Sequence, residues 1–318
     1  MCGIVGYVGS NSSLEVLLGG LRRLEYRGYD SAGVAVIGTD GTLSTRKRAG
    51  KLAVLADDLE ASPMADGQTG IGHTRWATHG GPTDGNAHPH LSADGRIALI
   101  HNGIIENFAV LKQELLDDGF EFESETDTEV AAKMLGREYE AGGGLAAALG
   151  RVVSRLDGAF TLLAVHQDEP GVVVGARRNS PLVIGLGEGE NFLGSDVAAF
   201  VEHTHRALAI GQDQIVVITA DEVTVTDFDG EPVETHEFEV SWDASAAEKG
   251  GWSSFMAKEI SEEPEAVANT ILGRVVDGQA VLPELEGLDE MLAGIDRVIV
   301  IACGTASSSG LVGKYAIE

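Results

Sequence analysis

Cys2 is the first side chain of the sequence that could act as a nucleophile. Because it is small, we expect removal of Met1, which would leave Cys2 with both a thiol and a free α-amine. That amine has an ordinary pKa of roughly 7.7–8.0, so near pH 7 part of it is neutral and can accept a proton. A thiol beside its own base is an activated nucleophile. The simpler alternative is that Cys2 only precedes a buried strand over Ile4–Val8.

Polar residues further along could complete a site around this thiol. Arg75 follows an apolar strand and could hold a carboxylate through paired hydrogen bonds, although a surface ion pair is equally in keeping with the sequence. Asn102-Gly103 combines an amide with a backbone N–H, the donors of an oxyanion hole, but is also typical of a turn. Asp127 could accept an ammonium or cap a helix. Together these groups could bind a free amino acid and cleave its side-chain amide.

The segments that must position these residues alternate between strands and helices. Apolar runs and alternation predict strands over 4–8, 34–37, 42–48, 70–74 and 96–101, and helical spacing predicts helices over 12–24, 51–60, 105–118, 124–140 and 145–156. Further strands are predicted over 161–166, 172–176, 182–186, 191–195, 207–210 and 214–219, with one short helix over 196–201. This order indicates stacked sheets with helices on their outer faces.

The C-terminal part of the sequence has a different pattern. Ser241–Gly251 is small and polar, as in a linker, and Phe255–Gly278 is predicted to be helical with an interruption near Pro264. Arg297–Ala302 is predicted to be an apolar strand that leads into a loop and a helix, as at the start of an α/β domain. We therefore expect domains over 1–240 and 291–318, joined by a helical segment over 241–290.

The charge and cysteine content of the chain limit the kinds of partner and compartment that we expect for it. The chain has 318 residues, a formal net charge of −28 and a pI of about 4.5. Acidic residues spread along the chain disfavour binding to nucleic acid and to anionic membranes. Such a distribution is typical of proteins from salt-loving organisms. The two cysteines are far apart, which excludes a disulfide framework and indicates a cytoplasmic protein. We find no signal peptide and no apolar run long enough to span a membrane.

Two His-x-His pairs could in principle chelate a metal. They are His88 with His90 and His203 with His205. Neither pair has a companion cysteine or carboxylate at ligand spacing. The sequence therefore predicts no metal and no cofactor.

Several motifs together resemble one family. Cys2-Gly3-Ile4-Val5-Gly6 resembles the start of class II, N-terminal-nucleophile glutamine amidotransferases, and the segments 22–33, 73–80, 101–107 and 124–129 are similar to motifs of the same family. The resemblance covers essentially the whole chain. It implies an α+β fold, the four-layer αββα sandwich of N-terminal-nucleophile hydrolases.

The resemblance also implies a reaction on L-glutamine. Cys2 would attack the side-chain amide, with its own α-amine relaying the proton. The side chain of Asn102 and the N–H of Gly103 would stabilise the tetrahedral oxyanion. Ammonia would leave, and water would then release glutamate from the thioester.

The same resemblance assigns residues to substrate binding. Arg75 would hold the α-carboxylate of glutamine, and Asp127 its α-ammonium. Thr78 and His79 would line the pocket. Trp76 would belong to a loop that shields the site and gates ammonia.

One branch of the family fits best. Its members pass ammonia to fructose 6-phosphate in a sugar-isomerase (SIS-type) half, and they are expected to be homodimers. The resemblance places a partial sugar-phosphate site at Cys303, Gly304, Thr305 and Ser307, but Ala306 stands where the branch usually has serine. Since the rest of that half is absent, this chain alone is expected to act only as a glutaminase. The alternatives are a glutaminase of the phosphoribosylpyrophosphate amidotransferase type and a non-catalytic glutamine-binding module.

Overall fold

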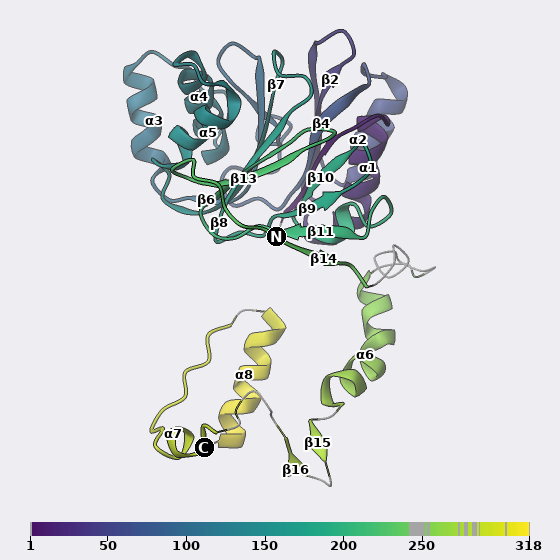
Figure 1. Ribbon diagram of the computed structural model, residues 1–318, viewed down its shortest axis with the longest axis vertical. Helices are drawn as coiled ribbons and strands as arrows, with labels where there is room; N and C mark the ends of the chain where they lie inside the picture. The colour runs from purple at the N-terminus through teal and green to yellow at the C-terminus, as the bar shows by residue number, and fades with distance from the viewer. Residues whose placement is uncertain are drawn as a thin grey trace. The chain divides into compact units, whose positions relative to one another are not determined.

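The computed structural model describes residues 2–241, 252, 255–272, 274–276, 279–281, 285, 287–302 and 304–317. The chain divides into two compact units, Met1–Gly251 and Trp252–Glu318. Figure 1 shows the elements of both, and each is described here by itself.

The first unit contains two antiparallel sheets. From edge to edge, the larger sheet consists of β14 (His236–Glu239), β11 (Arg206–Ala209), β9 (Val183–Leu186), β10 (Asn191–Gly194), β1 (Gly3–Val8), β4 (Gly67–Arg75), β2 (Ser31–Gly38) and β3 (Leu43–Ala49). The other consists of β13 (Val223–Asp227), β12 (Gln214–Ile218), β8 (Val173–Arg178), β7 (Gly158–His166), β6 (Ile97–Ile105) and β5 (His90–Leu91). The strand that follows Cys2 is therefore central in its sheet.

Helices cover the outer faces of the sheets. On the larger sheet lie α1 (Ser13–Leu24) and α2 (Leu52–Ala61), and on the other lie α3 (Phe108–Asp117), α4 (Asp127–Glu140) and α5 (Gly144–Val153) (Figure 1). Two short 3₁₀ helices, η1 (Glu25–Arg27) and η2 (Val197–Ala199), complete the unit. The predicted helix over 196–201 is reduced to η2.

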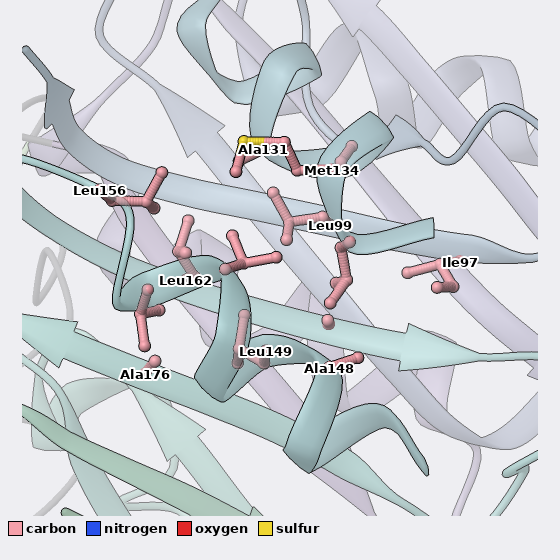
Figure 2. Close-up of a cluster of buried hydrophobic side chains, with 14 of the residues drawn as sticks. Ile97, Leu99, Ala131, Met134, Ala148, Leu149, Leu156, Leu162 and Ala176 are labelled. Atoms are coloured by element: carbon pink, nitrogen blue, oxygen red, sulfur yellow. The ribbon is translucent and has the colours of Figure 1, made fainter. Parts of the chain in front are cut away.

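The side chains of β1 alternate between the two faces of its sheet and so pack against two different layers. In β1, Val5 and Tyr7 pack against the helices of their sheet, whereas Ile4 and Val8 belong to the cluster between the sheets. Side chains alternate between the two faces of a strand, so both faces of β1 are buried. Figure 2 shows the corresponding cluster under the other helices, where Leu99 lies among residues of α4 and α5. The four-layer αββα sandwich is confirmed.

Two predicted boundaries near the site are wrong. The strand predicted to end at His101 continues through Asn102-Gly103 to Ile105, because these residues pair with β7, Gly103 lying opposite Phe160. As a consequence the following helix begins at Phe108 instead of residue 105. The dipeptide that resembled a turn is part of a strand. The strands β5, β13 and β14 were not predicted.

The second unit contains α6 (Phe255–Ile271), α7 (Asp289–Ala293), α8 (Gly304–Ile317) and a two-stranded ladder of β15 (Val275–Val276) and β16 (Gln279–Ala280). The predicted interruption near Pro264 is wrong, since α6 continues through it. Proline removes only one donor, to the carbonyl four residues earlier, and the helix persists on both sides.

The strand predicted over Arg297–Ala302 is also absent from the structure. Within the described residues this segment has no strand partner, and Ile301 is 93% exposed. A strand exists only through hydrogen bonds to a neighbour, so an apolar run by itself does not form one. Residues 242–251, which hold most of the predicted linker, lie outside the described residues. In the described part of the chain, no helix is long and apolar enough to cross a membrane.

Candidate functional site

Cys2 lies immediately before β1 and is partly buried. Its Sγ accepts a hydrogen bond from the backbone N–H of Trp76 at 3.1 Å and lies 3.6 Å from the Trp76 carbonyl oxygen. Burial raises the pKa of the thiol, and the Trp76 N–H opposes that shift only in part. With Met1 attached, the nitrogen of Cys2 is an amide without basicity. In this form the backbone nitrogen of Cys2 cannot accept the thiol proton.

Asn102 connects the two sheets at Cys2. From β6, its Nδ2 donates to the carbonyl oxygen of Cys2 at 2.9 Å, and its Oδ1 lies 2.9 Å from Nε2 of His73 in β4. The Asn102 amide has two N–H groups, so one of them is left for a further acceptor near Cys2. An amide N–H of this kind can serve as a donor in an oxyanion hole.

Gly103 follows Asn102 in β6, and no other residue type fits at this position. Its φ is +127°, and a Cβ at this position would lie 2.0 Å from the carbonyl oxygen of Ala159. Glycine alone allows this conformation and this close approach of β7. Gly103 is also exposed, in contrast to the buried residues before it in β6.

Arg75 ends β4 and is only 3% exposed. Its guanidinium donates to the carbonyl oxygens of Gly80 and Gly81, each at 3.3 Å, and of His79. Among the described residues no carboxylate lies within ion-pair distance of it, so the predicted alternative of a surface ion pair is wrong. A buried cation that contacts only neutral carbonyls favours an anionic ligand nearby.

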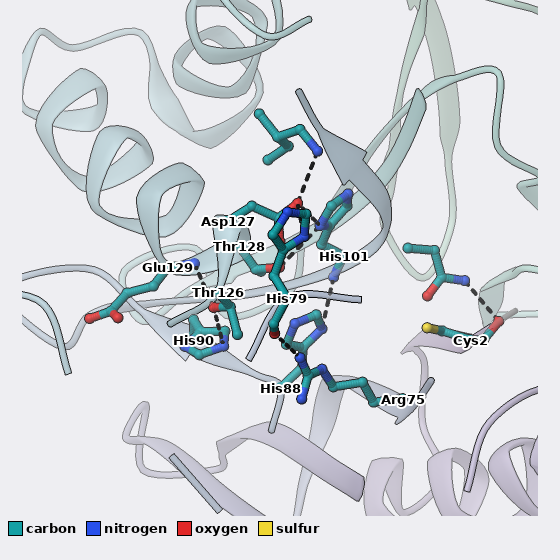
Figure 3. A network of polar contacts seen from close by, with 12 residues as sticks. Cys2, Arg75, His79, His88, His90, His101, Thr126, Asp127, Thr128 and Glu129 are labelled. Carbon is teal, nitrogen blue, oxygen red and sulfur yellow. Dashed lines mark hydrogen bonds and ion pairs between the residues drawn. The ribbon is translucent and has the colours of Figure 1, made fainter. Parts of the chain in front are cut away.

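Asp127 begins α4 and is likewise 3% exposed. The helix is capped by Thr126, whose Oγ1 accepts from Glu129 N at 3.2 Å, so capping does not account for Asp127. Its Oδ2 accepts from Ile105 N at 2.9 Å. The same oxygen lies 3.8 Å from Nδ1 of His101 and 3.9 Å from Nδ1 of His79 (Figure 3). This carboxylate can therefore receive a cationic group.

The loop after β4 joins these parts. Asp30 accepts from Ala77 N through its carboxylate and so holds the start of the loop. The indole of Trp76 is 49% exposed and meets the ring of Tyr29 edge-on at 5.4 Å. The ring of His79 packs against Phe108 at 4.9 Å. Thr78 is exposed, and no contact places it in the site.

Sequence reasoning assigned no role to His73, His101 or Asp30, although all lie within the motifs quoted above. The signal for His73 is its position two residues before Arg75, on a strand in which every residue except Gln68 is buried. Polar residues at such positions need partners inside the protein. Here the partner of His73 is the amide that contacts Cys2.

The remaining predicted sites are less well defined. Rings of His88 and His90 lie 5.1 Å apart, and His205 contacts the carbonyl oxygen of Val240. Within the described ranges, no group of three histidine, cysteine or acidic side chains could hold a metal. Of the predicted sugar-phosphate residues, Gly304, Thr305 and Ser307 lie in the first turns of α8 instead of a preceding loop, and Cys303 lies outside the described residues.

Comparison with known proteins gives matches to a family model, to curated relatives and to solved structures. Residues 47–231 match the family model described as a glutamine amidotransferase domain. The whole chain is 74% identical to a glutamine–fructose-6-phosphate aminotransferase (isomerizing) of Leifsonia xyli subsp. xyli and 60% identical to one of Streptomyces coelicolor, and it covers 52% of each. The chain thus spans about half the length of these curated relatives.

Solved structures agree in fold. A glutamine phosphoribosylpyrophosphate amidotransferase from B. subtilis, complexed with ADP and GMP, is 25% identical with a TM-score of 0.60. A structure described as the allosteric regulatory enzyme of purine biosynthesis is 28% identical with a TM-score of 0.62. Each match covers 71% of this chain and 49% of the other.

Proposed function

Since the chain belongs to the glutamine amidotransferase domain family, we propose that it hydrolyses the side-chain amide of L-glutamine with Cys2 as nucleophile. Once Met1 is removed, the α-amine of Cys2 takes the thiol proton, and Sγ bonds to the amide carbon. The proton passes to the departing nitrogen, which leaves as ammonia. Water then breaks the thioester, which releases glutamate and restores the thiol.

The observation that carries this proposal is the hydrogen bond from Asn102 Nδ2 to the carbonyl oxygen of Cys2, at 2.9 Å. It brings an amide donor from one sheet to the nucleophile of the other. The N–H of Gly103 is the second donor that we propose for the oxyanion. Two preorganised donors beside a thiol support acyl transfer over binding alone.

Charge in the site supports an amino acid as substrate. Arg75 and Asp127 are each 3% exposed, and they offer opposite charges within one buried region. We propose that Arg75 holds the α-carboxylate and that Asp127 holds the α-ammonium. We also propose that His79 and Thr78 line the pocket and that Trp76 shields it. Of these three, His79 is supported by its position beside Asp127.

The direct test is an assay of Met1-free protein with L-glutamine and fructose 6-phosphate. We expect equal amounts of glutamate and ammonia, and no glucosamine 6-phosphate, since the residues of this chain supply the proposed glutaminase site but only part of the proposed sugar-phosphate site. L-Asparagine is the control substrate, because its shorter side chain would not reach Cys2. Absence of glutamate would contradict the glutaminase proposal, and formation of glucosamine 6-phosphate would contradict its restriction to hydrolysis.

Replacing Arg75 with methionine should weaken glutamine binding. We expect kcat/KM to fall about 100-fold or more, mainly through KM, because the α-carboxylate loses its charged partner. Steady-state kinetics of glutamate release measures the change. Arg96→Met is the matched control, since Arg96 forms an exposed pair with Asp168. Equal kinetics of the two variants would contradict the assignment.

We propose that the ammonia is destined for fructose 6-phosphate, to give glucosamine 6-phosphate. The relatives at 74% and 60% identity carry the name of that aminotransferase. The fold similarity to phosphoribosylpyrophosphate amidotransferase, at 25% identity, supports the shared glutaminase chemistry more than that second acceptor.

Further proposals follow from the same relatives and from composition. They are a glutaminase domain over 1–240, a linking segment over 241–290 and the start of an SIS-type domain over 291–318, with partial phosphate binding at Cys303, Gly304, Thr305 and Ser307. We also propose a cytoplasmic protein that acts as a homodimer when joined to its sugar-isomerase half. The net charge of −28 supports a surface adapted to high salt.

A further inference from the structure

His73 is a completely buried histidine directly behind Asn102. It lies within β4, and its side chain is 0% exposed. Its Nε2 is 2.9 Å from Asn102 Oδ1, and Asn102 Nδ2 is 2.9 Å from the carbonyl oxygen of Cys2. A continuous line of contacts therefore runs from this imidazole to the nucleophilic residue.

The donors and acceptors of His73, Asn102 and Cys2 determine where the proton of His73 lies. Burial lowers the pKa of His73 to about 3, so near neutral pH the ring carries a single N–H. The carbonyl oxygen of Cys2 needs a donor, which places Nδ2 of Asn102 toward it and Oδ1 toward His73. Oδ1 is only an acceptor, so the one proton of His73 must be on Nε2.

The other tautomer would reverse the amide. With the proton on Nδ1, Nε2 of His73 would accept, and Asn102 would turn Nδ2 toward His73. Its Oδ1 would then face the carbonyl oxygen of Cys2, where two acceptors repel. Nδ1 has no hydrogen-bond partner within the described residues, and the ring of His88 lies 4.3 Å from that of His73. A proton on Nδ1 would therefore leave the Asn102 amide turned against the carbonyl oxygen of Cys2.

We propose that His73 is a positioning residue that fixes the amide of Asn102 with its N–H groups toward the reacting carbonyl of glutamine. The inference rests on the proposed glutaminase function. As negative charge develops on the substrate oxygen, it polarises the amide and makes Oδ1 more negative. The bond from His73 then strengthens, so its contribution is larger in the transition state than in the bound substrate.

Two substitutions separate this role from simple packing. His73→Met fills the space without a donor, and we expect kcat to fall about 10- to 100-fold while KM for glutamine stays within about 3-fold. His73→Gln keeps an N–H donor at a similar reach, and we expect it to recover most of the lost kcat. His166→Met is the control, since His166 is also buried, at 1% exposure, and stacks on Tyr139 at 3.8 Å.

The expected pattern is a loss of kcat in His73→Met, recovery in His73→Gln and parent kinetics in His166→Met. Equal kcat in His73→Met and the parent would overturn the proposal, as would equal losses in His73→Gln and His73→Met with unchanged melting temperatures.

A second measurement is independent of turnover. ¹⁵N NMR of histidine-labelled protein reports which nitrogen of His73 is protonated, and His73→Gln identifies its signals. We expect a protonated Nε2 and a bare Nδ1 at neutral pH, and a protonated Nδ1 would overturn the proposal. If the parent releases no glutamate yet shows the Nε2–H tautomer, the proposed function fails while this geometry stands.

Discussion

Replacing Cys2 with alanine should reduce glutamine hydrolysis by about 1000-fold or more, because the covalent bond to the substrate has no other atom to form on. The measurement is glutamate release by Met1-free protein under saturating glutamine. In the described structure the hydrogen bonds of the Cys2 side chain are made only with the backbone of Trp76. The substitution should therefore leave the melting temperature nearly unchanged.

Two comparisons make this result specific to the nucleophile. Cys2→Ser should retain a small residual rate, since a hydroxyl is a weaker nucleophile than a thiol. The same chain with Met1 retained should be inactive despite its intact thiol, because burial raises the pKa of Cys2 and the amide nitrogen offers no base. Glutamate release by Cys2→Ala equal to that of the parent would refute Cys2 catalysis.

Replacing Asn102 with alanine should lower kcat about 100- to 1000-fold, which corresponds to about 2.7–4 kcal/mol of transition-state stabilisation. Asn102 is 6% exposed, and its amide is one of the two donors proposed for the oxyanion. KM should change little, because the α-carboxylate and α-ammonium keep their partners. Steady-state kinetics with L-glutamine separates the two constants.

Asn191→Ala is the matched control for Asn102→Ala. Asn191 is 4% exposed, and its Nδ2 donates to the carbonyl oxygen of Thr219 at 2.8 Å, so the variant also loses a buried hydrogen bond. We expect a similar loss of stability in both variants but parent kcat only in Asn191→Ala. A raised KM with unchanged kcat in Asn102→Ala would assign Asn102 to substrate binding instead of oxyanion stabilisation.

Much of the fold followed from short-range patterns. Short runs of apolar and small residues predicted β1, β2 and β4, because a strand between a helix layer and a second sheet must bury both faces. Thr126 and Glu129 predicted the start of α4, and the Oγ1 of Thr126 does cap it. The glutamate instead reaches the backbone N–H of Ser124, at 2.7 Å. Such local signals need no knowledge of the distant chain.

Long-range pairing explains what could not be predicted. Asn102-Gly103 has the composition of a turn, and only its partner strand β7 makes it part of β6. The apolar pattern of Arg297–Ala302 predicted a strand, but no described neighbour pairs with it.

The candidate site, too, could be predicted from the sequence only in part. Residue types and the family resemblance pointed to Cys2, Arg75, Asn102 and Asp127. They did not reveal that Arg75 contacts the carbonyls of its own loop or that His73 supports Asn102. The Arg75 contacts depend on the path of the loop after β4, and the His73 contact depends on how one sheet packs against the other.

The central place of β1 also bears on when the enzyme becomes active. Its partners β4 and β10 lie later in the chain, with Val5 opposite Gly72 and Gly194. During translation, β1 cannot complete its ladders until β10 has left the ribosome. The proposed removal of Met1 would fall within that interval, before Cys2 is enclosed. The position of β1 would thereby place this step ahead of closure of the sheet.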